Sequence, residues 1–190
     1  MKKVTIIGGG LAGSEAALQL AKRGIYVDLY EMRPEKSTGA HKTGKFAEFV
    51  CSNSLGSYDI SNASGLLKHE MEILGSELMP IVLSSKVPAG GALAIDRELF
   101  SANVTKKIEE NPFINVIREE LKEIDTEIPV IIASGPLTSE ALSDNIKQIL
   151  GEDYLHFFDA IAPIVEKDSI NFNKAFYLNR YNKGDADYIN

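Results

Sequence analysis

The chain has 190 residues, 44% of them hydrophobic, which is enough to bury the core of one domain of ordinary size. No apolar run reaches the roughly 18 to 20 residues that a membrane span needs, and the single cysteine cannot form an internal disulfide, so we expect a soluble, cytoplasmic protein without a membrane partner. The net charge of −7 argues against a protein that binds nucleic acid mainly by electrostatic attraction, because neutralising phosphates needs clustered Lys and Arg.

The N-terminal residues predict a strand, a turn, a helix and a second strand. Residues 4–7 and residues 25–30 form two short apolar runs rich in β-branched and aromatic side chains, which predict strands. Between them, apolar residues at helical spacing predict a helix that packs on a sheet, and Gly24 is placed to end it. The predicted apolar face of this helix consists of Leu11, Ala12, Ala16, Leu18, Leu20 and Ala21.

The turn before this helix has the pattern G-x-G-x-x-G, formed by Gly8, Gly10 and Gly13. The first glycine permits the tight turn, the second lets a pyrophosphate approach the backbone, and the third lets the helix pack closely on the strand. The phosphates are expected at the helix N-terminus, where free N–H groups and the helix dipole favour an anion. The predicted cofactor-binding residues here are Gly8, Gly9, Gly10, Leu11, Ala12 and Gly13.

Glu31 ends the second predicted strand and is placed to accept hydrogen bonds from a ribose 2′-OH. A glycine-rich turn can arise by chance, but here the strand, the helix and the acid occur together, which predicts a dinucleotide site. The pattern does not distinguish NAD from FAD, and Glu31 argues against a 2′-phosphate. Arg33 is predicted to contact adenosine or its ribose, the alternative being a solvated surface arginine.

The middle of the chain predicts a long loop followed by helices. Residues 32–65 have little periodicity, and so long a loop in a compact domain is usually functional or disordered. Residues 64–79 predict a helix, and residues 87–96 predict a loop and a short strand. Asp96 is placed to cap a helix over residues 97–110, whose apolar face consists of Phe100, Val104 and Ile108.

Two further strands are predicted at residues 114–119 and 129–134, the second an apolar run suited to a central position in a parallel sheet. A turn at Gly135 and Pro136 leads into another helix, which Gly151 is placed to end. The alternation of strands and helices predicts an α/β fold with a doubly wound, Rossmann-like parallel sheet.

The residues after about 150 lack a closing helix or a capping sequence. We therefore expect residues 1–190 to form one dinucleotide-binding domain that is apparently incomplete. Within it, residues 33–95 would form a long cofactor and active-site region, and residues 150–190 the unfinished start of the next segment.

Several stretches of the sequence resemble one family, the bacterial folate- and FAD-dependent methyltransferases that make 5-methyluridine in RNA. The resemblance runs the whole length of the chain, and its most specific parts are "CSNSL" at 51–55 and "VPAGGALA" at 87–94. Other matching stretches are "GGGLAGSEAA" at 8–17, "LYEMRP" at 29–34, "SGPLTSE" at 134–140, "GEDYLHFFDAIAPIVEKDS" at 151–169 and "RYNKG" at 180–184. Flavoproteins that modify the wobble uridine of tRNA share the nucleotide motif and are the nearest alternative.

The resemblance implies a methyltransferase and the N-terminal part of a larger flavoprotein. In that family FAD is reduced by NAD(P)H and passes the one-carbon unit of 5,10-methylenetetrahydrofolate to C5 of the T-loop uracil of tRNA. The implied partners are tRNA and folate. Cys51 matches the family cysteine at the flavin and is the predicted catalytic residue, and Ser134 and Gly135 are further predicted cofactor contacts. No metal site is predicted, because no Cys and His cluster has ligand spacing.

The chain departs from the family pattern at three positions. It lacks the second family cysteine, the nucleophile expected on uracil C6, so these residues alone are not expected to complete methyl transfer. Gly56 stands where the family has an arginine, and Ser134 replaces a threonine while keeping the hydroxyl. A related enzyme acting on ribosomal RNA and an inactive FAD-binding fragment remain alternatives. His41, in a polar loop, is a further residue that either lines the active site or lies in solvent.

Overall fold

The computed structural model describes residues 3–151, 167–178 and 188–189. The chain divides into two compact units, residues 1–159 and 160–190, and each is described by itself. Most of residues 150–190, the predicted start of a next segment, lies outside the described residues. Within those that are described, no helix has the length and apolar character to cross a membrane. The same residues contain no group of three His, Cys, Asp or Glu side chains that could hold a metal ion.

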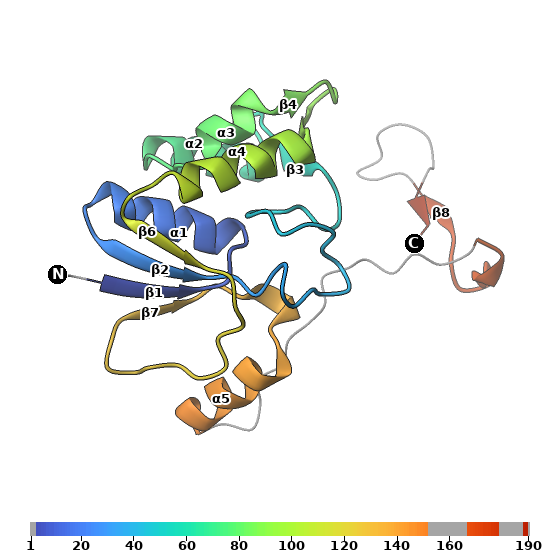
Figure 1. Cartoon of the computed structure of the whole chain (residues 1–190). Helices are drawn as coiled ribbons and strands as arrows, with labels where there is room; N and C mark the ends of the chain where they lie inside the picture. Colours follow the sequence, from blue (N-terminus) through green and yellow to red (C-terminus); the bar gives the residue numbers. More distant parts are fainter. Residues whose placement is uncertain (1–2, 152–166, 179–187, 190) are drawn as a thin grey trace. The chain divides into compact units, whose positions relative to one another are not determined.

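The first unit is built on a parallel sheet of four strands in the order β6-β2-β1-β7 (Figure 1). These strands are β1 (Lys3–Ile7), β2 (Tyr26–Tyr30), β6 (Ile114–Ile117) and β7 (Val130–Ile132). All three neighbouring pairs are parallel. The chain adds β2 and β6 on one side of β1 and then crosses to add β7 on the other side, so the winding reverses beside β1. The predicted α/β fold with a doubly wound sheet is confirmed.

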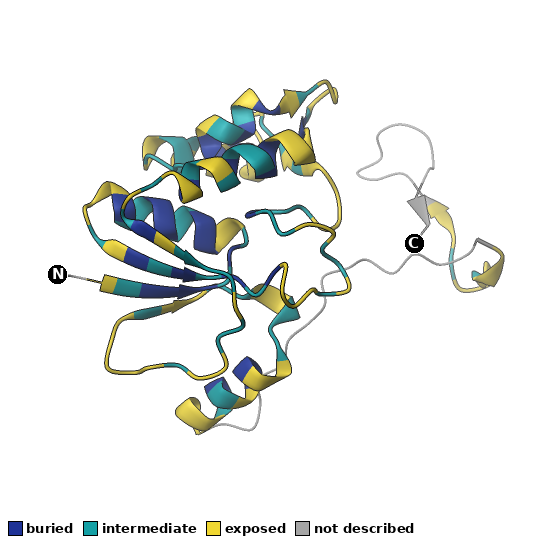
Figure 2. Ribbon diagram, viewed as in Figure 1, coloured by how far each residue is buried: buried dark blue, intermediate teal, exposed yellow. Residues whose placement is uncertain are grey.

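Helices cover both faces of this sheet. Figure 1 shows α1 (Leu11–Lys22) and α5 (Glu140–Leu150) on opposite sides of it. Successive side chains of a strand point to opposite faces, so Ile6 lies in the large core under α1 and Ile7 lies in a smaller core with Ile146 of α5. Figure 2 shows that the buried residues gather on the strands and on the helix faces that meet them.

Between β2 and β6 the chain forms a second layer on the α1 side of the sheet (Figure 1). Asp96 caps its last helix as predicted, because the carboxylate accepts hydrogen bonds from the backbone N–H groups of Glu98 and Leu99, each at 3.0 Å. The predicted apolar residues of this helix are all buried. The elements of the layer are β3 (Ser54–Ser57), α2 (Ala63–Ile73), α3 (Met79–Ser84), β4 (Lys86–Val87), β5 (Ala92–Ile95) and α4 (Arg97–Glu109), the three strands forming an antiparallel sheet of order β3-β5-β4.

The prediction of one helix over residues 64–79 is wrong. The structure has two helices there, because α2 ends at Ile73 and α3 begins at Met79. Gly75 lies between them with a φ of +76°, a conformation that side chains with a Cβ rarely adopt and that breaks the helical path.

The described strands do not show the predicted central position for residues 129–134. β7 lies at an edge of the sheet formed by the described strands, and Ile131 and Ile132 are 37% and 47% exposed. A run of apolar residues indicates that a strand has two apolar faces, but it carries no information on how many strands pair with it.

The predicted apolar face of α1 is partly wrong. Leu11 and Ala12 are exposed, whereas Gly13, Ser14 and Ala17 are buried. The first turn of the helix opens into a pocket rather than the core, so Leu11 and Ala12 stay exposed. From Ala17 onward the prediction agrees with the structure, and Gly24 follows the helix with a φ of +70°.

In the second unit the structure describes three short elements. β8 (Tyr177–Leu178) pairs antiparallel with β9 (Tyr188–Ile189), and a 3₁₀ helix, η2, covers Lys167–Ser169. The rings of Phe172 and Tyr177 stack with their centroids 5.4 Å apart.

Candidate nucleotide-binding site

A pocket of about 330 Å³ lies where β1, β2 and β7 end. Ile7 ends β1, Tyr30 ends β2 and Ala133 follows β7, and all three residues line it. The carboxyl ends of parallel strands leave a crevice at the point where the winding reverses, and ligands bind there in open α/β sheets. The volume lies at the lower end of the range of small-molecule sites.

The N-terminus of α1 opens into this pocket. Gly10, Leu11 and Ala12 line it, and within the described part of the chain their backbone N–H groups have no hydrogen-bond partner. A Cβ built on Gly10 would have no atom within 4 Å, so the backbone is approachable at this point. Unpaired N–H groups at the positive end of a helix dipole make a site for a phosphate. The residues present therefore fit the pyrophosphate of a dinucleotide.

Gly13 has a different role from the other glycines of the motif. It does not line the pocket, and a Cβ at this position would lie 1.8 Å from the carbonyl oxygen of Gly8. The absence of a side chain lets α1 lie directly on the turn that follows β1, as predicted for the third glycine of the pattern.

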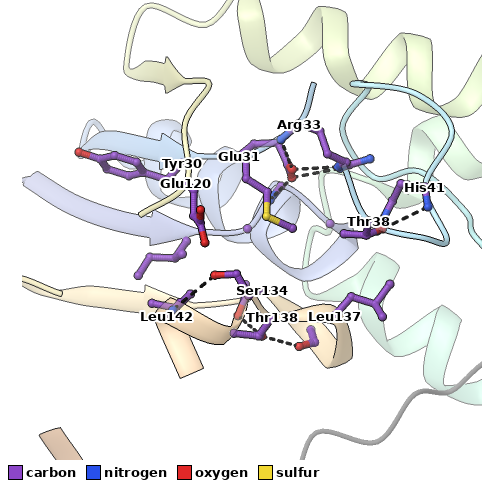
Figure 3. A pocket seen from close by; sticks show the side chains of 18 of the residues that line it. Tyr30, Glu31, Arg33, Thr38, His41, Glu120, Ser134, Leu137, Thr138 and Leu142 are labelled. Carbon is purple, nitrogen blue, oxygen red and sulfur yellow. Dashed lines mark hydrogen bonds and ion pairs between the residues drawn. The ribbon is translucent and has the colours of Figure 1, made fainter. Parts of the chain in front are cut away.

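Glu31 is buried beside the turn and accepts four hydrogen bonds. Its Oε2 accepts from Gly9 N at 2.9 Å and from Arg33 Nη2 at 3.0 Å, and its Oε1 accepts from the Arg33 backbone N at 3.0 Å and from Arg33 Nε at 2.8 Å (Figure 3). A carboxylate has about four lone-pair positions, so these donors occupy all of them. A ribose hydroxyl would have to replace one of them.

Arg33 is buried, so the alternative that it is a solvated surface arginine is wrong. It is 3% exposed and joins two carboxylates, because its Nη1 also lies 3.0 Å from Glu48 Oε2. Burial alone would raise the pKa of Glu31, but the hydrogen bonds and charge of Arg33, with the N–H of Gly9, outweigh it and hold that pKa below its usual value. Glu31 is therefore a carboxylate at neutral pH.

The loop between β2 and β3 is fixed to the core of the first unit. Phe46 and Ala47 are fully buried, and Ala47 N donates to the carbonyl of Gly9 at 2.8 Å. The Arg118 guanidinium lies 4.1 Å from the centre of the Phe46 ring and donates to the carbonyls of Arg33 and Gly44. These contacts hold the loop from Arg33 to Ala47 in place. The prediction of a loop over all of residues 32–65 is partly wrong, because β3 and the start of α2 lie within that range.

Polar side chains from three further segments line the pocket. Thr38 and His41 come from the loop after β2, and Thr38 Oγ1 lies 2.6 Å from His41 Nδ1 (Figure 3). Ser134 Oγ lies 2.7 Å from Thr138 Oγ1 on the turn after β7. Glu120, from the segment after β6, pairs with Lys36 at 2.7 Å, and this hydrogen bond, followed by one from Ser139, lowers the pKa of its carboxyl.

Cys51 does not line the pocket. It is an exposed free thiol on the loop after β2, and its neighbour Val50 does line the pocket. Cys51 makes no hydrogen bond to any part of the chain that the structure describes.

The structure brings most of the predicted cofactor residues together. Nine of them line the pocket, namely Gly8, Gly9, Gly10, Leu11, Ala12, Glu31, Arg33, Ser134 and Gly135. Sequence reasoning missed Thr38, Glu48 and Glu120, which also line it. No periodicity marks these residues, and the nearest signal was the unusual length of the polar loop that carries Thr38 and Glu48.

The family model described as "Glucose inhibited division protein A" matches residues 3–190. The chain belongs to this family. Among curated relatives, a protein named "Methylenetetrahydrofolate--tRNA-(uracil-5-)-methyltransferase TrmFO" from Aquifex aeolicus is 57% identical over 189 residues, and one of the same name from Bacillus subtilis is 58% identical over 187 residues. These alignments cover 100% and 98% of this chain but only 42% and 43% of the two relatives.

These relatives confirm the resemblance that the sequence motifs predict. Among solved structures, that of GidA from Aquifex aeolicus in its form II crystal matches this chain with a TM-score of 0.52 and 20% identity. The match covers 65% of this chain and 20% of that chain. At such an identity it supports the shared α/β fold alone.

Proposed function

We propose that this chain is the nucleotide-binding part of an FAD-dependent tRNA (uracil-5-)-methyltransferase. The enzyme would transfer a one-carbon unit from 5,10-methylenetetrahydrofolate to C5 of the T-loop uracil and reduce it at the expense of NAD(P)H. The observation that carries the proposal is the pocket at the N-terminus of α1, with its unpaired N–H groups. The names of relatives at 57% and 58% identity support the reaction.

The residues of this chain would bind and orient the cofactor. The N–H groups of Leu11 and Ala12 would hold the pyrophosphate, and the buried carboxylate of Glu31 would fix the turn of Gly9 against it. The ribose would lie near Glu31 and Arg33, and Ser134 and Gly135 would contact the cofactor from the other side of the pocket. Bound FAD supplies the redox and one-carbon chemistry, which no side chain of the pocket can supply.

Cys51 is the proposed catalytic residue, acting at the one-carbon group. Two observations support this proposal. Cys51 matches the family motif, and it is next in the chain to Val50, which lines the pocket. The thiol is exposed and therefore accessible to a substrate.

The first test of the proposal is FAD binding by the 190-residue chain. We expect flavin absorbance bands to remain with the protein after desalting. A protein that stays colourless after addition of FAD contradicts the proposed cofactor and leaves the pocket without its ligand.

The second test is methyl transfer. The chain is joined to the part of the Bacillus subtilis relative that lies beyond the match, and 5-methyluridine is measured in tRNA and in ribosomal RNA with methylenetetrahydrofolate and either nicotinamide donor. Product in tRNA is expected. Cys51→Ala should abolish it, whereas Ser52→Ala, a change of the next exposed residue, should leave it intact. Product in ribosomal RNA alone contradicts the proposed substrate.

One observation favours a narrower role for these residues. The net charge of −7 is unsuited to a surface that binds tRNA, and the chain spans less than half of the length of its relatives. The chain alone is therefore proposed to bind FAD without binding tRNA. A gel-shift titration with tRNA tests this, and tight binding by the chain alone would contradict it.

A further inference from the structure

The hydrogen bonds around Thr38 determine which nitrogen of His41 carries a proton. Thr38 Oγ1 faces His41 Nδ1 at 2.6 Å, and it accepts backbone N–H bonds from His41 at 3.2 Å and from Ala40 at 3.4 Å. A threonine hydroxyl has one proton and two lone pairs, and both lone pairs are used here. The hydroxyl proton is therefore donated to Nδ1, so Nδ1 is the bare nitrogen of the ring and Nε2 carries the hydrogen.

The surroundings of His41 keep its ring uncharged. Burial, and next the positive charge of Arg33, lower the pKa of His41 below its usual value, while Glu48 and Glu31 oppose them more weakly. Protonation of Nδ1 would also set an N–H against the O–H of Thr38 and remove their hydrogen bond. The ring is therefore a neutral imidazole at neutral pH, with one fixed tautomer.

The proton on Nε2 is free for a ligand. His41 lines the same pocket as the N-terminus of α1, and Nε2 has no hydrogen-bond partner among the residues that the structure describes. Figure 3 shows the ring held by Thr38 on the loop that also carries Arg33. A half-buried N–H with no partner gains by meeting an acceptor, because a polar group that stays unpaired away from water is costly.

We propose that His41 donates its Nε2 hydrogen to an oxygen atom of the bound dinucleotide, and that Thr38 is the positioning residue that holds the ring in the donating tautomer. This inference rests on the proposed nucleotide-binding function. Dinucleotides present oxygen acceptors on their phosphates, their sugar or ribityl chain and their flavin carbonyls. An uncharged donor meets such an acceptor without the desolvation cost of a cation.

The tautomer is tested first, in the 190-residue chain without ligand. Long-range ¹H–¹⁵N NMR of the ¹⁵N-labelled protein distinguishes a bare Nδ1 from a protonated one, and His41→Gln identifies the His41 signals. We expect a bare Nδ1 at neutral pH, kept in Thr38→Ser and lost in Thr38→Val, which has the shape of threonine without the hydroxyl. A protonated Nδ1 in the wild-type chain would overturn the proposal.

The ligand contact is tested by titrating FAD and ADP into three proteins. His41→Phe keeps a ring but has no N–H, and we expect FAD to bind about fivefold to tenfold more weakly. His41→Gln places an amide N–H near the position of Nε2 and should recover most of the affinity. Weakening of both FAD and ADP assigns the acceptor to the adenosine diphosphate half, and weakening of FAD alone assigns it to the flavin half.

Two outcomes separate this inference from the proposed function. If the wild-type chain binds neither FAD nor ADP, the proposed function and the inference both fail. If wild type and His41→Phe bind FAD equally well, only the role of His41 fails. Thermal unfolding shows whether each variant is folded. Should His41→Phe not fold, Thr38→Val replaces it, and normal FAD affinity in that variant would overturn the positioning role.

Discussion

Arg33 neutralises two carboxylates inside the protein. It is 3% exposed, and the side chains of Glu31 and Glu48 are 6% and 12% exposed. Removing the arginine side chain leaves both buried carboxylates charged and without this cation, with only backbone N–H groups and the Thr43 hydroxyl as donors. We expect Arg33→Met to lower the free energy of unfolding by about 3 to 5 kcal/mol, measured by urea denaturation at neutral pH.

The matched control for this change is Lys36→Met. Lys36 also pairs with a carboxylate, Glu120, but the lysine side chain is 50% exposed. Exposed ion pairs contribute at most about 1 kcal/mol, so this variant should unfold close to the wild type. If the two variants lost equal free energies of unfolding, burial would not be the reason that the Arg33 ion pairs stabilise the protein.

Two glycines of the same motif should respond differently to an added methyl group. In Gly13→Ala the new Cβ would meet the carbonyl oxygen of Gly8 at 1.8 Å, so we expect a loss of about 1 to 3 kcal/mol of stability. In Gly10→Ala no atom lies within 4 Å, and we expect unchanged thermal unfolding but FAD affinity reduced at least about tenfold, because the methyl group occupies the place of the pyrophosphate. Unaltered FAD binding by Gly10→Ala would contradict this placement.

At the scale of single residues, the sequence is sufficient to predict those that belong to a short local pattern of the backbone. The glycine turn and Glu31 follow from a short local pattern. The burial of Arg33 does not, because it depends on Glu48 and on the path of the loop between them. Thr38 was missed for the same reason, since its hydroxyl acts through a neighbour rather than through a motif.

Among the helices, α4 depends for its start on Asp96, the residue that precedes it. The Asp96 side chain satisfies two N–H groups of the first turn, whereas Asn62, at the start of α2, makes no side-chain cap bond. We expect Asp96→Ala to lose about 1 kcal/mol of stability and Asn62→Ala to lose much less, as measured by chemical denaturation. No loss of stability in Asp96→Ala would contradict the role of Asp96 as a stabilising cap.

The helices also show where the predicted periodicity failed. The apolar spacing of residues 64–79 runs through two helices, and the break at Gly75 depends on one left-handed residue that the spacing does not reveal. The capped start of α4 was predictable because an acidic residue before an apolar stripe has a local cause.

Across the whole molecule, several carboxyl groups have a pKa below the usual value, and so the protein should be sensitive to acid. In Glu31 and Glu48 the hydrogen bonds of their partners outweigh burial, and in Glu77 the hydrogen bonds of Lys107 and Lys22 lower the pKa. Such a group stabilises the folded state fully at a pH above its pKa in the unfolded chain, which is 4.5 for Glu. This stabilisation is lost as the pH falls through the lower pKa of the folded state. Urea midpoints should therefore fall below about pH 4.5, and Glu77→Gln should fall less steeply than the wild type. A midpoint that is constant or rises in acid would contradict this.

The class of the fold was predictable, but the place of each strand in the sheet was not. Alternating strands and helices are sufficient to predict a parallel sheet with helices on both faces. The edge position of β7 depends on which strands pair with it, and nothing in an apolar run such as Val130–Ile132 encodes its neighbours.

The burial of Phe46 has a consequence for how a ligand enters and leaves. A lid opens by turning a surface loop about its ends, but turning the loop after β2 would draw Phe46 and Ala47 out of the core. The Ala47 N–H bond to Gly9 would break with it, which would disturb the phosphate-binding turn itself. A bound nucleotide would therefore exchange past the turn after β7, residues 134–139, with the loop after β2 as the stationary side.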